Sequence, residues 1–350
     1  MQYVGIDWGT RRAAWCAFDE RGEMTEGAVS ADADGLARLV HTVGPDAYGC
    51  VEMMSGAVWV REQLQACGWR FAVADARKVK AIAPLACKTD KVDARVLAQL
   101  AARDLVPELW VPSLSDRELR ERLRRREHLV HLRTSARNRM FGLLTQWGLR
   151  GSLTTLRKPG ALERLPERGV PPVWIQSIRT LLEVVDDLDR QITQIELELR
   201  RIARTDPRAR LLMTVPGLGE LLALTITAEI GDISRFPSAR KLVGYAGLAP
   251  TIKQSGQSSW VGPISKAGSP MLRWAAVEAA QHAWRPTNPW HQLYTRTKTR
   301  HGKANPAKSA VARKVLIASW HVLARQQEFR PAASTIVPIC PGKLHEHLAA

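Results

Sequence analysis

Four acidic side chains stand at positions where a fold could bring them together. Asp7 and Glu52 each end a short apolar run, and Asp90 and Asp93 lie three residues apart at the start of a helical pattern. Positions i and i+3 share a helix face, and adjacent strand ends meet at one edge of a sheet. Crowded carboxylates need cations to neutralise them, and hard oxygen ligands select Mg²⁺ or Mn²⁺. The spacing therefore predicts a divalent-metal site, in which two ions about 4 Å apart would suit phosphoryl transfer.

Each of these acids also has an ordinary structural explanation. Asp7 could cap a turn, Glu52 could be a solvated strand end, and Asp90 could be the N-cap of a helix whose dipole Asp93 favours. Taken singly, these explanations are the more common ones. The four acids together, in this order and on these elements, favour the metal site.

The residues around the acids predict a mixed α/β unit. Short apolar or alternating runs predict strands, and apolar steps of three and four predict helices. The predicted strands cover residues 2–7, 12–18, 24–29, 47–52 and 71–74, and the predicted helices cover 34–42, 58–66 and the residues from Asp90 onward. This order is that of an RNase H-like (RuvC-like) layer, a mixed sheet with helices on its faces.

The rest of the chain is predicted to be mostly helical. A coiled-coil seam is indicated by apolar residues that alternate steps of three and four, namely Ile178, Leu181, Val185, Leu188, Ile192, Ile195, Leu199 and Ile202. This seam fits a helical hairpin or dimerisation arm, and equally a helix buried in its own bundle. We expect a RuvC-like domain (1–112), a helical coiled-coil linker and oligomerisation region (113–210), a mostly helical serine-bearing domain (211–325) and a tail (326–350).

Hydroxyl groups and cations gather in a polar loop that we expect over residues 251–268. It contains Lys253, Ser255, Ser258 and Lys266, together with Ser259 and Ser265. A hydroxyl becomes a useful nucleophile when a base or a metal takes its proton. Residue chemistry alone does not choose among these serines, any one of which is more often a solvated loop residue.

Two glycines upstream of this loop suit a contact with phosphate. Gly217 and Gly219 precede an apolar helix, as in a helix-hairpin-helix-like turn whose backbone N–H groups approach a phosphate. A plain turn between helices needs similar residues. Trp284 and Trp290, beside Arg285, offer base-stacking platforms, although core packing explains most tryptophans.

The charge of the chain points to a polyanionic partner. The formal net charge is +17, and the excess of Lys and Arg lies after residue 112, whereas the first third is nearly neutral. An acidic metal site in the first third and a phosphate-binding surface on the rest would produce this division. Solvated helix faces would also produce it.

Other sequence features favour a protein of the prokaryotic cytoplasm. The five cysteines are Cys16, Cys50, Cys67, Cys87 and Cys340, and they form neither a C-x-x-C pair nor a Cys/His cluster. This spacing predicts neither a zinc site nor a disulfide framework. We expect no signal peptide and no membrane-spanning run.

At the level of motifs, the chain resembles the DEDD-type insertion-sequence transposases, which are related to the Piv DNA invertases and described as bridge-RNA-guided recombinases. The resemblance covers roughly residues 1–325 and rests on the blocks Gly5-Ile6-Asp7, Val-Glu-Met-Met-Ser-Gly (51–56), Lys-Thr-Asp-Lys-Val-Asp-Ala-Arg (88–95), Val-Pro-Gly-Leu-Gly (215–219), Gly-Tyr-Ala-Gly-Leu-Ala-Pro (244–250) and Ser-Lys-Ala-Gly (265–268). The block at 88–95 is the specific one.

The resemblance implies roles for particular residues. Asp7, Glu52, Asp90 and Asp93 match the metal-binding tetrad, and Ser255 matches the catalytic serine. The spacing of the serine loop differs slightly from the family pattern, which leaves Ser258 as an alternative nucleophile. The implied reaction is strand exchange through a covalent phosphoserine–DNA intermediate. Its site joins the acidic domain of one subunit to the serine domain of another.

The resemblance also implies partners. They are donor and target DNA, a structured RNA encoded by the element, and further copies of the chain in a tetramer built from dimers. Residues 113–208 diverge freely in this family, so RNA contacts there cannot be carried over residue by residue.

Three other functions remain in view. The first is a RuvC-like junction-resolving nuclease that uses a metal-activated water, and the second is a nucleic-acid-binding protein with a structural acidic cluster. The third is a sugar kinase with the actin-like fold, because residues 5–10 resemble the first phosphate loop of those enzymes. Residues 151–350 offer neither the second phosphate loop nor the adenosine motif of such kinases.

Overall fold

The computed structural model describes residues 1–82, 89–255 and 258–331, which form two compact units, 1–112 and 113–350. Unit 1 contains β1 (Gln2–Trp8), β2 (Arg12–Phe18), β3 (Met24–Ser30), α1 (Ala33–Val43), β4 (Ala47–Glu52), α2 (Ala57–Ala66), β5 (Arg70–Ala74), α3 (Ala76–Ile82) and α4 (Asp90–Ala102). The predicted strands and helices of this unit are confirmed to within one residue where bounds were given, and α3 is an addition.

The strands of unit 1 form one mixed sheet in the order β3-β2-β1-β4-β5. β1 pairs antiparallel with β2 and parallel with β4, which also pairs parallel with β5. Val4 and Ile6 face α1 and α2 and pack in one core cluster with Leu39 and Leu64. The intervening residues of β1 face the other side of the sheet, because successive side chains of a strand alternate between its faces.

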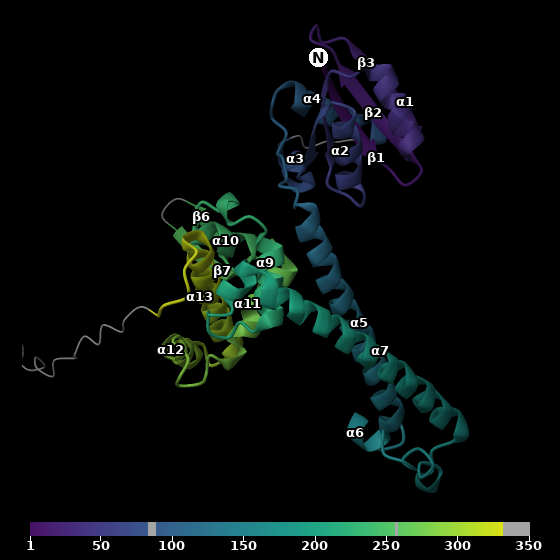
Figure 1. Cartoon of the computed structure of the whole chain (residues 1–350), viewed down its shortest axis with the longest axis vertical. Helices are drawn as coiled ribbons and strands as arrows, with labels where there is room; N and C mark the ends of the chain where they lie inside the picture. Colours follow the sequence, from purple (N-terminus) through teal and green to yellow (C-terminus); the bar gives the residue numbers. More distant parts are fainter. Residues whose placement is uncertain (83–88, 256–257, 332–350) are drawn as a thin grey trace, which may run out of the picture. The chain divides into compact units, whose positions relative to one another are not determined.

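Helix α4 covers that other side. A Cβ added at Gly5 would overlap the carbonyl oxygen of Ala94 and the amide nitrogen of Ala98, so α4 lies directly against β1. The Cys50 thiol reaches the Leu97 carbonyl at 3.4 Å and fixes the helix over β4 as well. The sheet is therefore covered by α1 and α2 on one face and by α4 on the other (Figure 1).

Unit 2 is mostly helical, as predicted. Its elements are α5 (Leu114–Thr145), α6 (Leu153–Leu156), η1 (Pro166–Arg168), α7 (Pro172–Thr205), α8 (Pro207–Leu212), α9 (Glu220–Ile230), η2 (Ile233–Arg235), α10 (Ala239–Tyr245), β6 (Pro250–Ser255), β7 (Ser258–Ile264), α11 (Pro270–Ala279), η3 (Ala280–His282), α12 (His291–His301) and α13 (Ala304–Arg325). The strands β6 and β7 correct the polar loop expected over 251–268, because these residues pair as an antiparallel hairpin.

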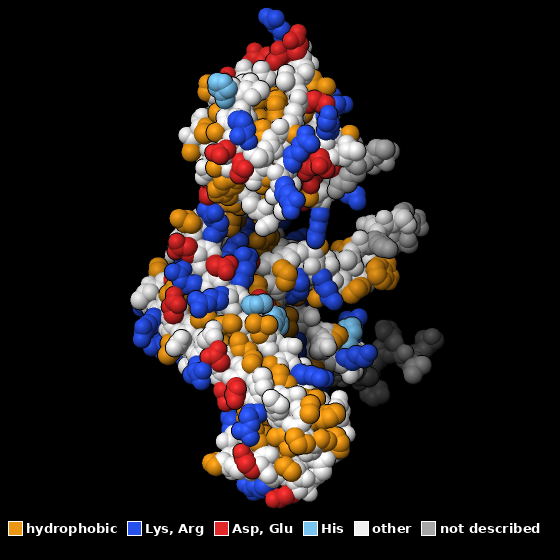
Figure 2. Space-filling model, turned by 90° about the vertical axis from the view of Figure 1, so that its right-hand side faces the viewer, with side chains coloured by type: hydrophobic (Ala, Val, Ile, Leu, Met, Phe, Trp, Pro, Cys, Tyr) orange, Lys and Arg blue, Asp and Glu red, His pale blue; other side chains and the backbone are white. Residues whose placement is uncertain are grey.

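Helices α5 and α7 run side by side as a two-helix arm (Figure 1). The seam residues of α7 are buried or half-buried, and the arm's core also includes Leu119, Leu123 and Met140 of α5. Ion pairs such as Arg126–Glu196 (2.6 Å) and Arg133–Asp189 (3.0 Å) cross between the helices. Basic and acidic side chains are interspersed along this part of the surface (Figure 2). The coiled-coil spacing is thus satisfied within one chain, as a helical hairpin.

The largest core lies in the rest of unit 2, where α8, α9, α11 and α13 bury leucine, valine and alanine side chains against one another. None of the helices in residues 1–82, 89–255 and 258–331 has the length and apolar character needed to cross a lipid bilayer.

Candidate active-site residues

Strand register places Asp7 and Glu52 side by side at the ends of neighbouring parallel strands. Ile6 pairs with Val51, so the next residue of each strand is the acid, and both acids are half-buried. Asp7 shares a sheet face with Gly5, and Glu52 shares one with Cys50, because each pair is two residues apart. Both carboxylates therefore lie on the face that α4 covers.

The N-terminal end of α4 points toward the strand ends that carry Asp7 and Glu52. The later residues Leu100 and Ala101 pack in a cluster with Tyr3 and Tyr48, near the starts of β1 and β4, while Ala94 lies over Gly5. The residues that precede Ala94 therefore run toward Asp7. Asp93 is half-buried, and Asp90 is exposed.

The helix cap of α4 is a threonine. The Thr89 hydroxyl accepts a hydrogen bond from the amide of Val92 at 3.3 Å, and Asp90 is the first helical residue. The structural explanation of Asp90 as N-cap is therefore wrong. Lys88, the first residue of the block that contains Asp90, lies outside the described residues, as do Cys87 and Cys340.

The acids do not close into a ligand cluster. Among the residues that the structure describes, no group of three or more His, Cys, Asp or Glu side chains is arranged to hold a metal ion. The convergence of all four carboxylates on one metal site stays a prediction. The donor set still fits a hard divalent cation, because it consists of carboxylate oxygens on one face of one unit.

Two of the described cysteines, Cys16 and Cys50, are unsuited to metal or nucleophilic chemistry because they are buried. Cys50 is fully buried, and burial followed by the nearby Glu52 charge raises the pKa of its thiol to about 12. Burial also raises the pKa of the Cys16 thiol. A thiol at such a pKa carries almost no thiolate at neutral pH, so these residues act as small core side chains.

Ser255 is the last residue of β6 and lies at the tip of the hairpin. It pairs with Ser258, the first residue of β7, and it is exposed. Gly256 and Gln257, which connect the two strands, lie outside the described residues.

The base of this hairpin is fastened to the helical core. The Lys266 amide donates to Gly247 O at 3.0 Å, and Arg273 donates to Ala246 O at 3.0 Å and to Lys266 O at 3.2 Å. Lys266 is exposed and has φ 53°, a left-handed conformation that is uncommon outside glycine. Such backbone strain persists where the surroundings impose it. The Lys266 position is therefore held by the fold.

A buried acid completes this anchor. The Ser269 hydroxyl donates to Glu229 at 2.7 Å and accepts from the Leu272 amide at 3.1 Å, so it caps α11. Glu229 is 6% exposed. Sequence inspection missed Arg273, Ser269 and Glu229. The only signal was that Ser269 follows directly on the Ser-Lys-Ala-Gly block, with Arg273 four residues later.

The glycine turn before α9 has a packing explanation. Gly217 has φ 89°, and a Cβ there would overlap the Ala279 carbonyl oxygen. Gly219 is the exposed N-cap residue of α9, with open space around its Cα. Gly219 therefore has open space on the side where a Cβ would lie, whereas Gly217 is needed for close packing. Lys253 lies in β6, opposite Trp260.

The two tryptophans proposed for stacking differ. Trp284 is 55% exposed, and the Arg285 guanidinium lies 5.7 Å from its ring centre. Trp290 packs against Phe329, with ring centres 5.9 Å apart. Trp284 thus remains a stacking candidate, whereas Trp290 is a packing residue.

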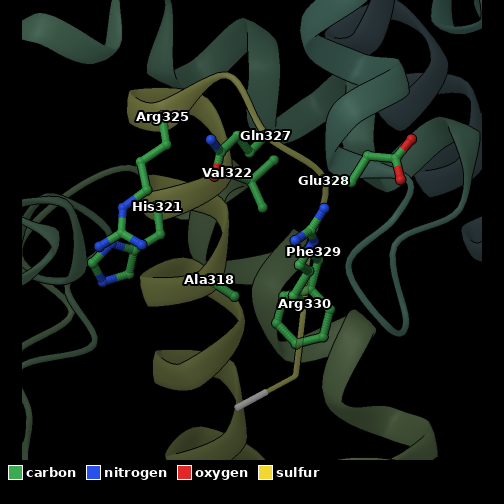
Figure 3. A pocket seen from close by; sticks show the side chains of 8 residues that line it. All are labelled: Ala318, His321, Val322, Arg325, Gln327, Glu328, Phe329 and Arg330. Atoms are coloured by element: carbon green, nitrogen blue, oxygen red, sulfur yellow. The ribbon is translucent and has the colours of Figure 1, made fainter. Parts of the chain in front are cut away.

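A pocket at the end of α13 adds further cations. Its volume is about 260 Å³, and its lining includes His321 and Arg325 of the helix and Phe329 and Arg330 of the following segment. Figure 3 shows the Arg325 guanidinium beside the His321 ring, with Glu328 pointing away from both. Sequence inspection did not single out these residues.

Comparisons with known proteins find two family matches along the chain. Residues 4–148 match a family model described as a transposase, of the DEDD type found in IS110 elements, and residues 209–296 match the transposase family IS116/IS110/IS902. The chain is 26% identical, over 95% of its length and 92% of the relative's, to the transposase for insertion sequence element IS1111A of Coxiella burnetii. It is 30% identical to the pilin gene-inverting protein of Moraxella bovis, over 69% of this chain and 68% of that protein.

Proposed function

Because this chain belongs to the IS110/IS116 family of transposases, whose members are enzymes of DNA transposition, we propose that it is the recombinase of an insertion sequence and exchanges strands through a phosphoserine–DNA intermediate. The sheet order of unit 1 and the position of α4 support an RNase H-like fold for the catalytic unit. A DEDD-type domain also suggests the use of a divalent metal.

In this proposal the hydroxyl of Ser255 is the nucleophile. Its oxygen forms a bond to a backbone phosphorus, the bond from phosphorus to the departing DNA oxygen breaks, and the serine proton leaves to a base or solvent while the departing oxygen gains one. The phosphoserine ester conserves the free energy of the broken DNA phosphodiester bond. Attack by a hydroxyl of the partner strand then reverses the step and releases the serine.

Unit 1 would supply the electrostatic part of the reaction. Mg²⁺ or Mn²⁺ held by Asp7, Glu52, Asp90 and Asp93 would promote deprotonation of an attacking hydroxyl and neutralise charge on the departing oxygen. The neighbouring strand ends of Asp7 and Glu52, and the place of Asp93 in the first turn of α4, support this ligand set. Thr89 caps the helix, which leaves Asp90 available for such a role.

The observation that carries the proposal is the position of Ser255, an exposed residue at the tip of a hairpin whose base is hydrogen-bonded to the helical core. Ser258, the residue paired with it, is the alternative nucleophile. DNA is the substrate of a transposase. A guide RNA encoded by the element, a tetramer built from dimers and a cytoplasmic location belong to the proposal, and the net charge of +17 supports the nucleic-acid partners.

Trapping of a covalent protein–DNA adduct tests the proposal. We expect the wild-type protein, given its own element's ends and Mg²⁺, to form an adduct that survives denaturing electrophoresis, and Ser255→Ala to abolish it. Ser258→Ala serves as the matched control, because it removes the hydroxyl of the paired residue. Loss of the adduct in Ser258→Ala alone would move the nucleophile to that residue. Strand exchange by Ser255→Ala at the wild-type rate would refute the serine mechanism.

A further inference from the structure

The segment that joins α5 and α7 at the end of the two-helix arm is folded and has a core of its own. Two antiparallel helices can be joined by about two to eight residues, but here the whole segment between Thr145 and Pro172 is folded, with α6 and η1 inside it. Leu156, Leu162 and Leu165 of this segment pack in a core cluster with Met140 and Ile178 of the long helices. We call this segment, residues 146–171, the arm tip.

A pocket of about 270 Å³ opens in the arm tip. Part of its lining is apolar, namely Leu144, Leu149, Leu156 and Leu165. The remainder includes four cations, Arg150, Lys158, Arg164 and Arg168, and no acidic residue. An apolar floor beside several positive charges suits a ligand with a flat apolar body and a negative group.

Neighbouring arginines form ion pairs, whereas the four pocket cations form none with the residues that the structure describes. Arg157 of the same segment pairs with Asp189 at 2.7 Å, and Arg179 of α7 pairs with Glu163 at 3.4 Å. Among the described residues, none of the four pocket cations has a carboxylate within salt-bridge distance. Arg164 donates to the carbonyls of Gly160 and Pro159. All four are exposed, so their charge remains available to a ligand.

We propose that the arm-tip pocket binds an unpaired nucleotide of a nucleic-acid strand, with its base against the leucine floor and its phosphates against Arg150, Lys158, Arg164 and Arg168. This inference rests on the proposed function for the presence of nucleic acid. The volume is just below the range of about 300 Å³ and above in which small-molecule pockets fall, which suits one base. A duplex keeps its bases stacked and cannot place one on a concave floor, whereas single-stranded DNA and RNA loops can.

Fluorescence anisotropy with short labelled oligonucleotides tests the pocket. The probes are single-stranded DNA, RNA of the same sequence, each strand with one abasic position, and the corresponding duplex. We expect Arg164→Gln/Arg168→Gln to weaken single-strand binding by about tenfold or more and to lower the slope of log affinity against log salt by about 1.4, if both arginines contact phosphates. The single strand with the larger loss identifies DNA or RNA as the source of the nucleotide.

Two further variants separate the pocket from general charge. Arg124→Gln/Arg125→Gln removes two exposed arginines of α5 outside the pocket, and we expect its effect to be several-fold smaller. Ala161→Phe keeps every charge but fills the pocket, and we expect it to abolish the preference for a strand with an intact base over an abasic one. Thermal melts should show that all three variants remain folded.

Two outcomes would overturn the proposal. Equal weakening by both arginine pairs would mean that charge alone binds the strand, and equal weakening of duplex and single-strand binding would mean that no unpaired nucleotide is held. The proposed function fails separately, because it depends on the Ser255 adduct. If the protein binds single strands in this pocket but never forms that adduct, the proposed recombinase mechanism is refuted and the proposed nucleotide pocket is not.

Discussion

Single residues carry the chemistry that we propose, and these residues differ in how deeply they are buried. Asp7 and Glu52 are half-buried at strand ends, whereas Asp90 is exposed and its neighbour Thr89 caps the helix. Burial raises the pKa of the Cys16 and Cys50 thiols and makes them poor nucleophiles, whereas Ser255 is an exposed residue. The candidates for reaction are therefore the acids of unit 1 and the hydroxyl of the hairpin.

Amide substitution of two acids tests the metal site. We expect Asp7→Asn and Asp93→Asn to abolish strand exchange without lowering the melting temperature, because removing a charge relieves repulsion among the carboxylates. Saturating Mg²⁺ should raise the melting temperature of the wild type, by the equivalent of about 2.7 kcal/mol at a hundredfold excess over Kd, and not that of the variants.

Asp34→Asn is the control for this test. Asp34 is an exposed acid in the first turn of α1, on the opposite side of the sheet. Its variant should keep both activity and the Mg²⁺ shift. An Asp7→Asn protein that unfolds outright would favour a structural role for the acid.

At the scale of elements, the acids depend on how closely α4 approaches β1. The missing side chain of Gly5 permits that approach, because backbone atoms of α4 occupy the space of a Cβ. Alternation along the strand then gives Asp7 the same face. One glycine thus decides how near the start of α4 comes to the strand ends.

Alanine at Gly5 should disrupt this packing. We expect Gly5→Ala to destabilise the protein by about 3 kcal/mol or more, since the overlapping atoms are backbone and cannot rotate away. Denaturant unfolding followed by circular dichroism measures the change. Gly142→Ala, at an open helical position of α5, should instead stabilise by up to about 1 kcal/mol. Equal stability of Gly5→Ala and wild type would show that α4 can move away.

The position of the β6–β7 hairpin likewise depends on the contacts that fasten its base to the helical core. Ser269→Ala removes the cap of α11 and a partner of the buried Glu229, so we expect a loss of about 1–3 kcal/mol. We also expect slower adduct formation with unchanged DNA affinity, because the hairpin would lose its fixed base. Ser269→Thr keeps the hydroxyl and should restore both. An adduct rate that Ser269→Ala leaves unchanged would show that the anchor does not position the serine.

At the scale of the whole molecule, the acids and the serine belong to different compact units. If the acids of one subunit work with the serine of another, two inactive variants should complement each other. Coexpressed Asp7→Asn and Ser255→Ala chains would form mixed dimers, each with one intact composite site. We expect about a quarter of wild-type strand exchange from random pairing.

The control for complementation is coexpression of Asp7→Asn with Asp93→Asn, which share one unit and should stay inactive together. If acids and serine of one chain formed each site, every mixed dimer of Asp7→Asn and Ser255→Ala would be inactive too. A lack of complementation in otherwise stable mixed dimers would therefore reject the shared site.

The amino-acid sequence alone determined most local elements, because short apolar runs and periodic apolar spacing are signals that lie along the chain. The short apolar runs of β2 and β4 and the seam of α7 were predictable from the sequence, and so was the excess of positive charge after residue 112. The sequence also indicated Asp7, Glu52 and Ser255 as candidates, although their roles remain predictions. The hairpin of β6 and β7 was missed because its polar residues lack an apolar alternation, although a two-residue connection containing glycine was a signal for it.

Only the tertiary structure decided which distant residues meet. The order of the sheet brought Asp7 beside Glu52, and Gly5 admitted α4 against both strands. Arg273 and Glu229 became anchors of the hairpin through contacts with residues far along the chain. The pocket of the arm tip likewise combines leucines with cations that lack carboxylate partners among the described residues. Burial, ion pairing and close approach are relations between residues, and a pattern along the chain does not contain them.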